Sequence, residues 1–579
     1  MRRKSAALAV FFAIALLVRD RQADWAVLSS LTASVGLAGK RAAVAAESAA
    51  SRPLPLVVGV ATHFDQGWPL DLVRRTRDLQ IGIIRDDLPW GKGEPEPGRY
   101  DFDGGSAAYV AQSCGQGLKL LLMIDPHHAA YDKGATAHTP AAQRAYADYL
   151  NAVLDRFGSG CIEAIEVGNE INAGDSRLPA GVTVASAHTS LLKTVASVVK
   201  PRYPDVQILA GSSNMVATGF EDTLFAQGVL DSADGIAVHP YRDHPEGLEV
   251  ELPRLRAAMH RHGRVRPIWA TETGDEVDDP RMSASLMIRM LCLIAAEPDV
   301  AGLFWYALID EPYFRNTGLL DSEARTKPAG EAMLAAKRLL LAHGRPVRVG
   351  ARDRRNYVYR FGAQTYVIWG VPRPIHVEGN ARNFDVRGQR LVGPLVAGPD
   401  PIIVTGADRV TLGASQVMAD SLYQYAGPPW SYLARRATGQ TVPLKIIDWN
   451  WTSYWGDLDL RPLAIGEASA TPAGEGSNPL AATVRYTASV TTPASISACF
   501  TTGSHNDGLS IEIRHNNRVI HQAILTDRLE VKALPVTLKT GDRLDVAFGP
   551  NKVFDGDALT YRIRILALGA KTQEHASCA

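Results

Sequence analysis

The stretch Ile162-Glu-Ala-Ile-Glu-Val-Gly-Asn-Glu170 begins as an apolar-rich, strand-like run and ends abruptly in Gly-Asn-Glu. A second run, Pro267-Ile-Trp-Ala-Thr-Glu-Thr-Gly274, ends in the same way, with Glu272 near its tip. Two carboxyl groups on the ends of two strands are what glycosidic-bond cleavage needs, because one protonates the leaving oxygen and the other attacks the sugar or steers water. Two strand-end glutamates in ordinary salt bridges would show the same pattern, so the surrounding elements must decide.

From Leu56 onward, apolar strand-like runs alternate with amphipathic, helix-like stretches. The predicted strands are Leu56–Ala61, Ile81–Asp87, Leu118–Asp125, Ile162–Glu170, Val206–Ser213, Gly235–Tyr241, Pro267–Gly274 and Gly302–Leu308. The predicted helices are Leu70–Leu79, Ala141–Phe157, Val184–Val199, Leu248–His262, Arg281–Ala296 and Pro328–His343. This alternation fits an α/β fold of the (β/α)₈, or TIM, barrel type, which typically takes ~250 residues. A doubly wound sheet is the alternative, but no GxGxxG pattern follows the first strand.

Polar and aromatic residues follow the predicted strands at their carboxyl ends, where a (β/α)₈ barrel carries its chemistry. In chain order they are His63, Arg85, Asp86, Asp87, Trp90, Asp125, His127, His128, Asn169, Glu170, Ser212, Ser213, Asn214, His239, Tyr241, Glu272, Trp305, Tyr306, Asp310 and Glu311. A barrel with a purely structural role would not need such residues at the same end of all its strands. The pattern therefore predicts an active site there.

Several of these motifs resemble a known family. The segment from Arg85 to Phe102, RDDLPWGKGEPEPGRYDF, resembles the strand-2 segment of the family 39 β-xylosidase-like glycoside hydrolases and their polysaccharide-hydrolase relatives. The same holds for Phe304-Trp-Tyr306, followed by Gly318-Leu-Leu320 and Lys327-Pro-Ala329. The resemblance covers residues 55–345 and extends to the large clan of retaining (β/α)₈ hydrolases with an acid/base on strand 4 and a nucleophile on strand 7.

The resemblance implies roles for three charged residues. Glu170 would be the general acid and then the general base, and its pKa is expected to be high enough to hold a proton. Glu272 would be the nucleophile and must stay ionised. Arg85 could hold Glu272 charged and oriented by a charge-assisted hydrogen bond. Alternatively, Arg85 forms an ion pair at the barrel mouth with Asp86 or Asp87.

Five other residues are candidates for substrate binding. Asn169 would hydrogen-bond the 2-hydroxyl of the sugar, unless it only forms a turn. His239 and Tyr241 resemble the strand-6 pair of the clan, which contacts the nucleophile, although a lone strand histidine is often a core residue. Trp305 offers an aromatic face to a sugar or fills the core, and Trp90 is a weaker candidate of the same kind.

His127 could line an outer sugar subsite together with His128 and Asp125. These residues could also be interpreted as metal ligands, but no third ligand has a suitable spacing. The five cysteines are scattered, and no CxxC pair or His/Cys cluster is present. The sequence therefore predicts neither a metal nor another cofactor, and it leaves the disulfide pairing open.

The N-terminus is typical of an export segment. Arg2, Arg3 and Lys4 precede an apolar run, Ala6–Val18, whose length suits a signal-peptide core better than a membrane span of ~20 residues. A second apolar stretch leads to the small-residue site Ala43-Val-Ala-Ala46. Either cleavage is late or the first run remains as an anchor. We exclude residues 1–52 from the fold and assign residues 53–344 to the barrel.

Two all-β units are predicted after the barrel. Residues 345–418 form a small β domain, in which Tyr357–Phe361 and Thr365–Trp369 are predicted to pair as a hairpin. Residues 419–579 resemble a β-sandwich or jelly roll. Four tryptophans fall between Trp430 and Trp455. They could stack sugars on an exposed surface or fill the sandwich core and an interdomain seam.

The charge balance excludes an electrostatic nucleic-acid binder, since 61 basic residues face 61 acidic ones. We therefore predict an exported retaining glycoside hydrolase whose partner is a polysaccharide or oligosaccharide. A non-catalytic glycan-binding or exopolysaccharide-assembly protein on a barrel scaffold is the rival prediction. Transglycosylation would use the same residues with a different acceptor. The sugar, the linkage and endo or exo action do not follow from the sequence.

Overall fold

The computed structural model describes residues 54–350, 354–475, 478–503, 507–551, 557–571 and 574–578. The predicted export segment, residues 1–52, lies outside these ranges. Within them, every helix is too short or too polar to cross a bilayer.

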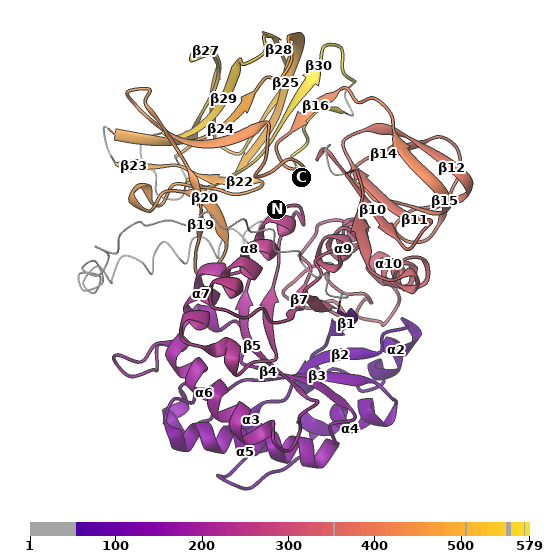
Figure 1. The fold of residues 1–579 in the computed structure, drawn as a ribbon, viewed down its shortest axis with the longest axis vertical. Coiled ribbons are helices and arrows are strands. Elements are labelled where there is room, and N and C mark those ends of the chain that lie inside the picture. Colours follow the sequence, from indigo (N-terminus) through magenta and orange to yellow (C-terminus); the bar gives the residue numbers. More distant parts are fainter. Residues whose placement is uncertain are drawn as a thin grey trace, which may run out of the picture.

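The N-terminal part of the described chain is a closed barrel of eight parallel strands in the order β1 to β8 (Figure 1). The strands are β1 Val57–Ala61, β2 Ile83–Asp87, β3 Lys119–Ile124, β4 Ile162–Val167, β5 Gln207–Asn214, β6 Gly235–His239, β7 Ile268–Thr273 and β8 Val300–Trp305. The ring closes where Val57 of β1 pairs with Gly302 of β8. The predicted (β/α)₈ barrel is confirmed, and all eight predicted strands are present.

Helices surround this barrel. They are α2 Leu72–Asp78, α3 Trp90–Gly93, α4 Ala108–Gly115, α5 Pro140–Phe157, α6 Val184–Val199, α7 Thr218–Ala226, α8 Leu248–Arg261, α9 Pro280–Ala295 and α10 Pro328–Leu339. Three of these helices, α3, α4 and α7, were not predicted from the sequence, and they have four, eight and nine residues. Helices this short are smaller than the window of 11–18 residues over which a helical hydrophobic period becomes readable.

A layer of apolar side chains fills the lower barrel interior. Each of the strands β2 to β8 contributes one member: Ile83, Leu121, Ala164, Leu209, Ala237, Trp269 and Phe304. Trp269 needs the space at Gly302, where a Cβ atom would lie 2.4 Å from the Trp269 ring. This apolar layer fills the barrel interior. The polar side chains nearer the carboxyl ends of the strands therefore rest on an apolar base.

The remaining described strands form antiparallel sheets, which confirms the two predicted all-β units after the barrel. The first sheet contains β9 Pro346–Arg348, β10 Asn356–Phe361, β11 Thr365–Gly370, β12 Arg373–Phe384, β13 Arg390–Leu391, β14 Leu395–Ala397 and β15 Ile402–Leu412. The predicted hairpin is β10 paired with β11, with Phe361 opposite Thr365.

Two further sheets form a sandwich. One contains β16 Val417–Asp420, β19 Lys445–Asp448, β20 Ser453–Gly456, β21 Ala464–Ile465, β22 Ser469–Thr471, β25 Thr492–Thr502, β28 Arg528–Leu538 and β30 Leu559–Ala567. The other contains β17 Trp430–Arg436, β18 Thr441–Pro443, β23 Ala473–Glu475, β24 Asn478–Thr487, β26 Leu509–His515, β27 Arg518–Leu525 and β29 Arg543–Pro550. Buried side chains of both sheets meet in one core, where the ring centroids of Phe500 and Phe548 lie 5.8 Å apart.

The clustered tryptophans divide into two pairs. Trp430 is buried beside Tyr486, and Trp455 stacks on Tyr432 with ring centroids 4.7 Å apart. These two belong to the sandwich core. Trp449 and Trp451 instead lie in the turn between β19 and β20 and are half-buried.

Two disulfides join cysteines whose pairing the sequence left open. Cys114 at the end of α4 bonds Cys161 just before β4, Cys499 bonds Cys578, and Cys292 is a buried free thiol.

Removing the barrel disulfide is expected to destabilise the protein. The Cys114–Cys161 bond closes a loop of 47 residues, and such a cross-link restricts the unfolded chain. We expect a Cys114→Ala/Cys161→Ala variant to lose about 2–4 kcal/mol of unfolding free energy, measured from guanidinium midpoints. The oxidised wild type is the reference, because reductant would also break the Cys499–Cys578 bond. Identical midpoints for variant and oxidised wild type would contradict the expectation.

Candidate active site

The two strand-end glutamates face each other across the carboxyl end of the barrel. Glu170 follows β4 in a left-handed conformation with φ of 46°, a backbone state that non-glycine residues rarely adopt outside turns and functional sites. Glu272 lies within β7 and is 7% exposed. One oxygen of each carboxylate and one ring nitrogen of His239 all lie within 4.8 Å of one another. The structure thus brings together two acidic groups 102 positions apart in the chain.

Arg85 in the middle of β2 binds three side chains at once. Its Nε donates to Glu166 at 2.6 Å, its Nη1 donates to Glu272 at 2.6 Å, and its Nη2 donates to Asn169 Oδ1 at 2.9 Å. Burial alone would lower the pKa of Arg85, but the charges of Glu166 and Glu272 raise it above its usual range. Arg85 therefore contacts the β7 carboxylate directly. Its ion-pair partners are Glu166 and Glu272, and not Asp86 or Asp87 as in the alternative prediction.

Glu166 is a site residue that the sequence analysis missed. It is fully buried in β4 and accepts hydrogen bonds from Arg85, from Ser212 at 2.7 Å and from Thr271 at 2.8 Å. Burial would raise the pKa of Glu166, but the Arg85 charge and the nearby His239 lower it to about 2. A signal was available: a charged residue inside an apolar strand, two positions after the interior residue Ala164, lies on the same face of β4 and points into the barrel.

His239 lies among three carboxylates and is fully buried. Its Nδ1 is 3.2 Å from Glu170 Oε1 and 3.6 Å from Glu272 Oε2, and its Nε2 is 3.6 Å from Glu166 Oε1. Burial would lower the pKa of His239, but the charge of Glu272 and the contacts with Glu166 and Glu170 raise it to about 9. The ring is therefore an imidazolium at neutral pH, and it is not a neutral core histidine.

The pKa of Glu170 is lowered, whereas the sequence analysis expected it to be high. Burial raises this pKa, but the hydrogen bond and charge of His239, a 2.7 Å hydrogen bond from Asn214 and the charge of Arg85 outweigh it. The two groups meet where His239 Nδ1 lies 3.2 Å from Glu170 Oε1. The difference arises because His239 is charged. Its charge depends on Glu166, Glu170 and Glu272, which lie far from it in the sequence.

Tyrosines complete the surroundings of Glu272. The Tyr241 hydroxyl donates to Glu272 Oε2, on the oxygen that Arg85 does not bind. Tyr306 packs edge-on against Tyr241 with ring centroids 6.0 Å apart, and its hydroxyl is 3.0 Å from His63 Nε2. Both oxygens of the Glu272 carboxylate are therefore fixed by donors, which orients it. Asn169 remains exposed beside it.

Three predicted substrate-binding residues lie in other surroundings. Trp305 is 1% exposed, and its indole N–H donates to the Thr317 carbonyl at 2.8 Å. Trp90 is equally buried and stacks on Tyr131 with centroids 5.1 Å apart. Neither ring offers an open face, because both side chains are almost fully buried. His127 is held 2.9 Å from Asp125 and 3.2 Å from Asp175, in an ion-pair cluster at the end of β3.

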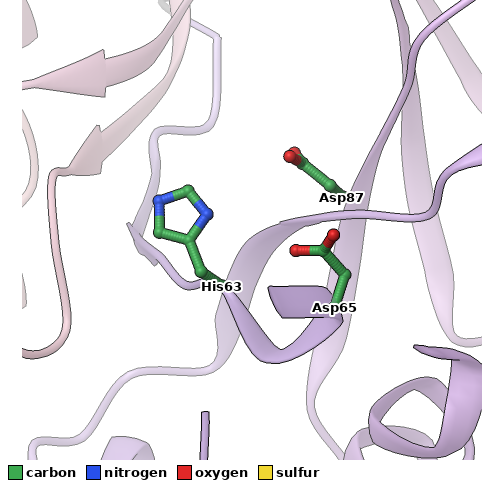
Figure 2. A group of neighbouring side chains, drawn as sticks. All are labelled: His63, Asp65 and Asp87. Carbon is green, nitrogen blue, oxygen red and sulfur yellow. The ribbon is translucent and has the colours of Figure 1, made fainter. Parts of the chain in front are cut away.

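Two groups among the described residues have donor atoms close enough to share a cation. One is Glu170, His239 and Glu272, but the imidazolium and Arg85 already supply positive charge there. Figure 2 shows the other, in which Asp65 and Asp87 lie beside His63. In this second group, Lys92 Nζ lies 3.7 Å from Asp65 and Gln66 contacts His63 Nδ1 at 3.1 Å, whereas the buried Oδ1 atoms of Asp65 and Asp87 have no hydrogen-bond partner in the described part of the chain.

Replacing Arg85 by methionine is expected to destabilise the protein strongly. The change leaves Glu166 and Glu272 buried without their cation, and breaking a buried pair in this way costs about 3–5 kcal/mol. Guanidinium unfolding midpoints measure the loss. Arg281→Met, which removes an exposed arginine paired with Asp279, is the matched control and should leave the midpoint unchanged. Equal midpoints for the two variants would contradict the central role of Arg85.

No protein-family model and no curated protein sequence matches the chain. Solved structures do match it. The chain is similar to a family 39 glycoside hydrolase from the gut symbiont Bacteroides cellulosilyticus WH2, with 22% identity and a TM-score of 0.52 over 61% of this chain and 81% of that one.

Two further matches have lower scores. A family 39 β-xylosidase from Caulobacter crescentus matches with 15% identity and a TM-score of 0.45 over 62% of this chain and 97% of that one. A GH5_18 protein from Bifidobacterium longum subsp. infantis matches with 17% identity and a TM-score of 0.39 over 48% and 78%. At the identity of the first match the likeness shows the fold: this chain has a (β/α)₈ barrel similar to that of a family 39 glycoside hydrolase.

Proposed function

We propose that this protein is a retaining glycoside hydrolase that cleaves a polysaccharide or oligosaccharide, with Glu272 as nucleophile and Glu170 as acid/base. The observation that carries the proposal is the approach of their carboxylate oxygens to within 4.8 Å. Retaining enzymes hold the two carboxyl groups ~5–5.5 Å apart, whereas inverting enzymes need ~6.5–9.5 Å to admit a water molecule between carboxylate and sugar.

In the first step, Glu272 attacks the anomeric carbon and the bond to the leaving oxygen breaks. Glu170 gives its proton to that oxygen, so the leaving group departs as an alcohol and the sugar remains as an ester of Glu272. In the second step, Glu170 takes a proton from water, and the water oxygen displaces Glu272. Arg85 and Tyr241 support this role of Glu272, because their hydrogen bonds to its two oxygens hold the carboxylate in one orientation.

The acid proton of Glu170 is stored on its neighbour. In the free protein His239 carries the proton, and transfer over the 3.2 Å contact gives protonated Glu170 and a neutral imidazole without changing the charge of the site. A bound sugar displaces water from the half-exposed Glu170, and this further burial favours its neutral form. The pair therefore behaves as one titrating unit with one proton to give.

If His239 and Glu170 share this proton, kcat/KM should decline only at alkaline pH. The pair keeps its proton below the His239 pKa of about 9 and loses it above, so activity should fall only as the pH rises past about 9. His239→Asn leaves the proton on Glu170 alone and should move this decline to lower pH. His262→Asn, at a surface histidine paired with Asp222, is the control and should leave it in place. Superimposable profiles for His239→Asn and wild type would refute the shared proton.

The configuration of the first product tests the proposed mechanism. Proton NMR follows the anomer released from a panel of 4-nitrophenyl β-xylosides, mannosides, glucosides and glucuronides, together with xylan and mannan. Retention of configuration is expected. Release of the opposite anomer, or no cleavage of any glycan in a wider panel by the folded full chain, would overturn the proposal.

We also propose that the protein is exported. The leader-like segment and two disulfides support this proposal, because disulfides persist in oxidising compartments. Thiol titration in denaturant tests it on protein from the native host: one free thiol per chain, Cys292, is expected from the five cysteines. Five titrating thiols and recovery from the cytoplasm would contradict export.

A further inference from the structure

A hairpin of the C-terminal sandwich reaches the barrel. Strands β19 and β20 pair with Asp448 opposite Ser453, and their turn is Trp449-Asn-Trp-Thr452. In Figure 1 these strands extend from the sandwich toward α7 and α8 of the barrel. The hairpin thus meets helices that lie about two hundred positions earlier in the chain.

Three contacts fix this turn on the barrel helices. Arg254 in α8 forms a two-pronged ion pair with Asp448, with both N–O distances 2.8 Å. Thr452 donates to Glu251 at 2.9 Å. The Gly219 amide in α7 donates to the Trp449 carbonyl at 3.0 Å, and a Cβ atom on Gly219 would lie 2.6 Å from the Asp448 carbonyl oxygen. Only glycine permits this approach, so the turn is held at a defined position.

The turn also connects to the acid/base glutamate. The Asn172 side chain donates to the Asn450 carbonyl at 2.8 Å and to the Asn214 carbonyl at 3.2 Å. Asn172 Oδ1 in turn accepts from the Asn214 amide at 2.9 Å, and the Asn214 side chain donates to Glu170 at 2.7 Å. Two asparagines therefore separate the turn from the group that would protonate the leaving oxygen.

The side chains of this turn are suited to carbohydrate. Trp449 and Trp451 are half-buried, and Asn450 between them is exposed. The Trp449 ring packs edge-on against Tyr454, with ring centroids 6.3 Å apart. Aromatic rings combine a broad apolar surface with a polar N–H, which matches the apolar C–H face and the hydroxyl rim of a pyranose. The sandwich core does not need these two rings, because Trp430 and Trp455 already pack within it.

We propose that the Trp449–Thr452 turn forms a binding site for the leaving-group part of a glycan chain, with the two tryptophans contacting pyranose rings beyond the scissile bond. The side follows from Glu170, since the acid/base lies next to the leaving oxygen. This inference rests on the proposed hydrolase activity and adds a substrate class to it: chains that continue for at least one sugar past the cleavage point.

Alanine at Trp451 and at Trp449 tests the site, because the anchors of the turn are Asp448, Thr452 and two backbone carbonyls. Each variant is assayed on the polysaccharide of the panel that the wild type cleaves and on the corresponding glycosyl fluoride, whose leaving group is a single atom. For at least one variant we expect kcat/KM on the polysaccharide to fall about tenfold or more, with the fluoride rate unchanged. Phenylalanine at the same position should restore part of the loss.

The controls separate the possible failures. Leu458→Ala, an exposed apolar residue just after β20, should change neither rate. Equal rates of wild type and both alanine variants on polysaccharide would overturn the binding site while leaving the hydrolase intact. Equal losses on both substrates would show that the turn supports the site as a whole and not the sugar, which also overturns it. An equal loss on the polysaccharide and on the corresponding methyl glycoside, whose poor leaving group needs the acid but carries no further sugar, would show that the turn acts through Glu170, and this too would overturn the binding site. A wild type inactive on both substrates would instead overturn the proposed function.

Discussion

Replacing Glu272 by alanine is expected to lower kcat on an aryl glycoside by about 10⁴-fold or more, because the nucleophile is then absent and no covalent intermediate can form. Added azide should restore activity, since a small anion fits the space of the lost carboxylate. Azide attacks from the face that Glu272 occupied, so the product should be a glycosyl azide of inverted configuration, which NMR identifies.

The control for this variant is Glu276→Ala, four positions further along and paired with Arg315 at the surface. It should retain wild-type activity. In the wild type, a 2-deoxy-2-fluoro glycoside should trap the ester, and mass spectrometry of the peptides should place the label on Glu272. Wild-type activity in Glu272→Ala would remove the mechanism. A folded protein that takes no label and cleaves no glycan would favour the non-catalytic scaffold.

The residues that the sequence predicted well are those whose signal is local. The run that becomes β4 ends in Asn169-Glu170, and the run that becomes β7 carries Glu272 at its end, so each glutamate follows from its own apolar segment. Barrel geometry then puts both at one end of the ring without further information. Arg85 and Tyr241 were found in the same way, and the structure places both against Glu272.

The properties that the sequence did not predict depend on pairing across the ring. In the sequence, Glu166 is one charged residue in an apolar strand. Its role becomes clear only from the hydrogen bonds that Arg85, Ser212 and Thr271 donate to it. The lowered pKa of Glu170 requires the charged His239. Neither burial of a tryptophan nor the docking of a turn 278 positions away from Asn172 has a local signature.

Replacing Glu170 by glutamine is expected to separate substrates by their leaving groups. An oligosaccharide leaves as a poorly stabilised alkoxide unless it is protonated, so its cleavage should slow by about 10²–10⁴-fold. A 2,4-dinitrophenyl glycoside leaves as a stable phenolate and needs no acid, so its first step should be almost unchanged. The second step still lacks the base, so a rapid burst of dinitrophenol equal to the enzyme concentration should precede slow turnover.

Glu163→Gln is the matched control, because Glu163 lies on the same strand at an odd spacing from Glu166 and is only half-buried. Azide in Glu170→Gln should now give a glycosyl azide of retained configuration, since it displaces Glu272 from the face where water normally attacks. The opposite configurations of the two azide products would assign the two carboxylates to opposite faces of the sugar. Equal slowing of both substrates, with no burst, would contradict Glu170 as the acid/base.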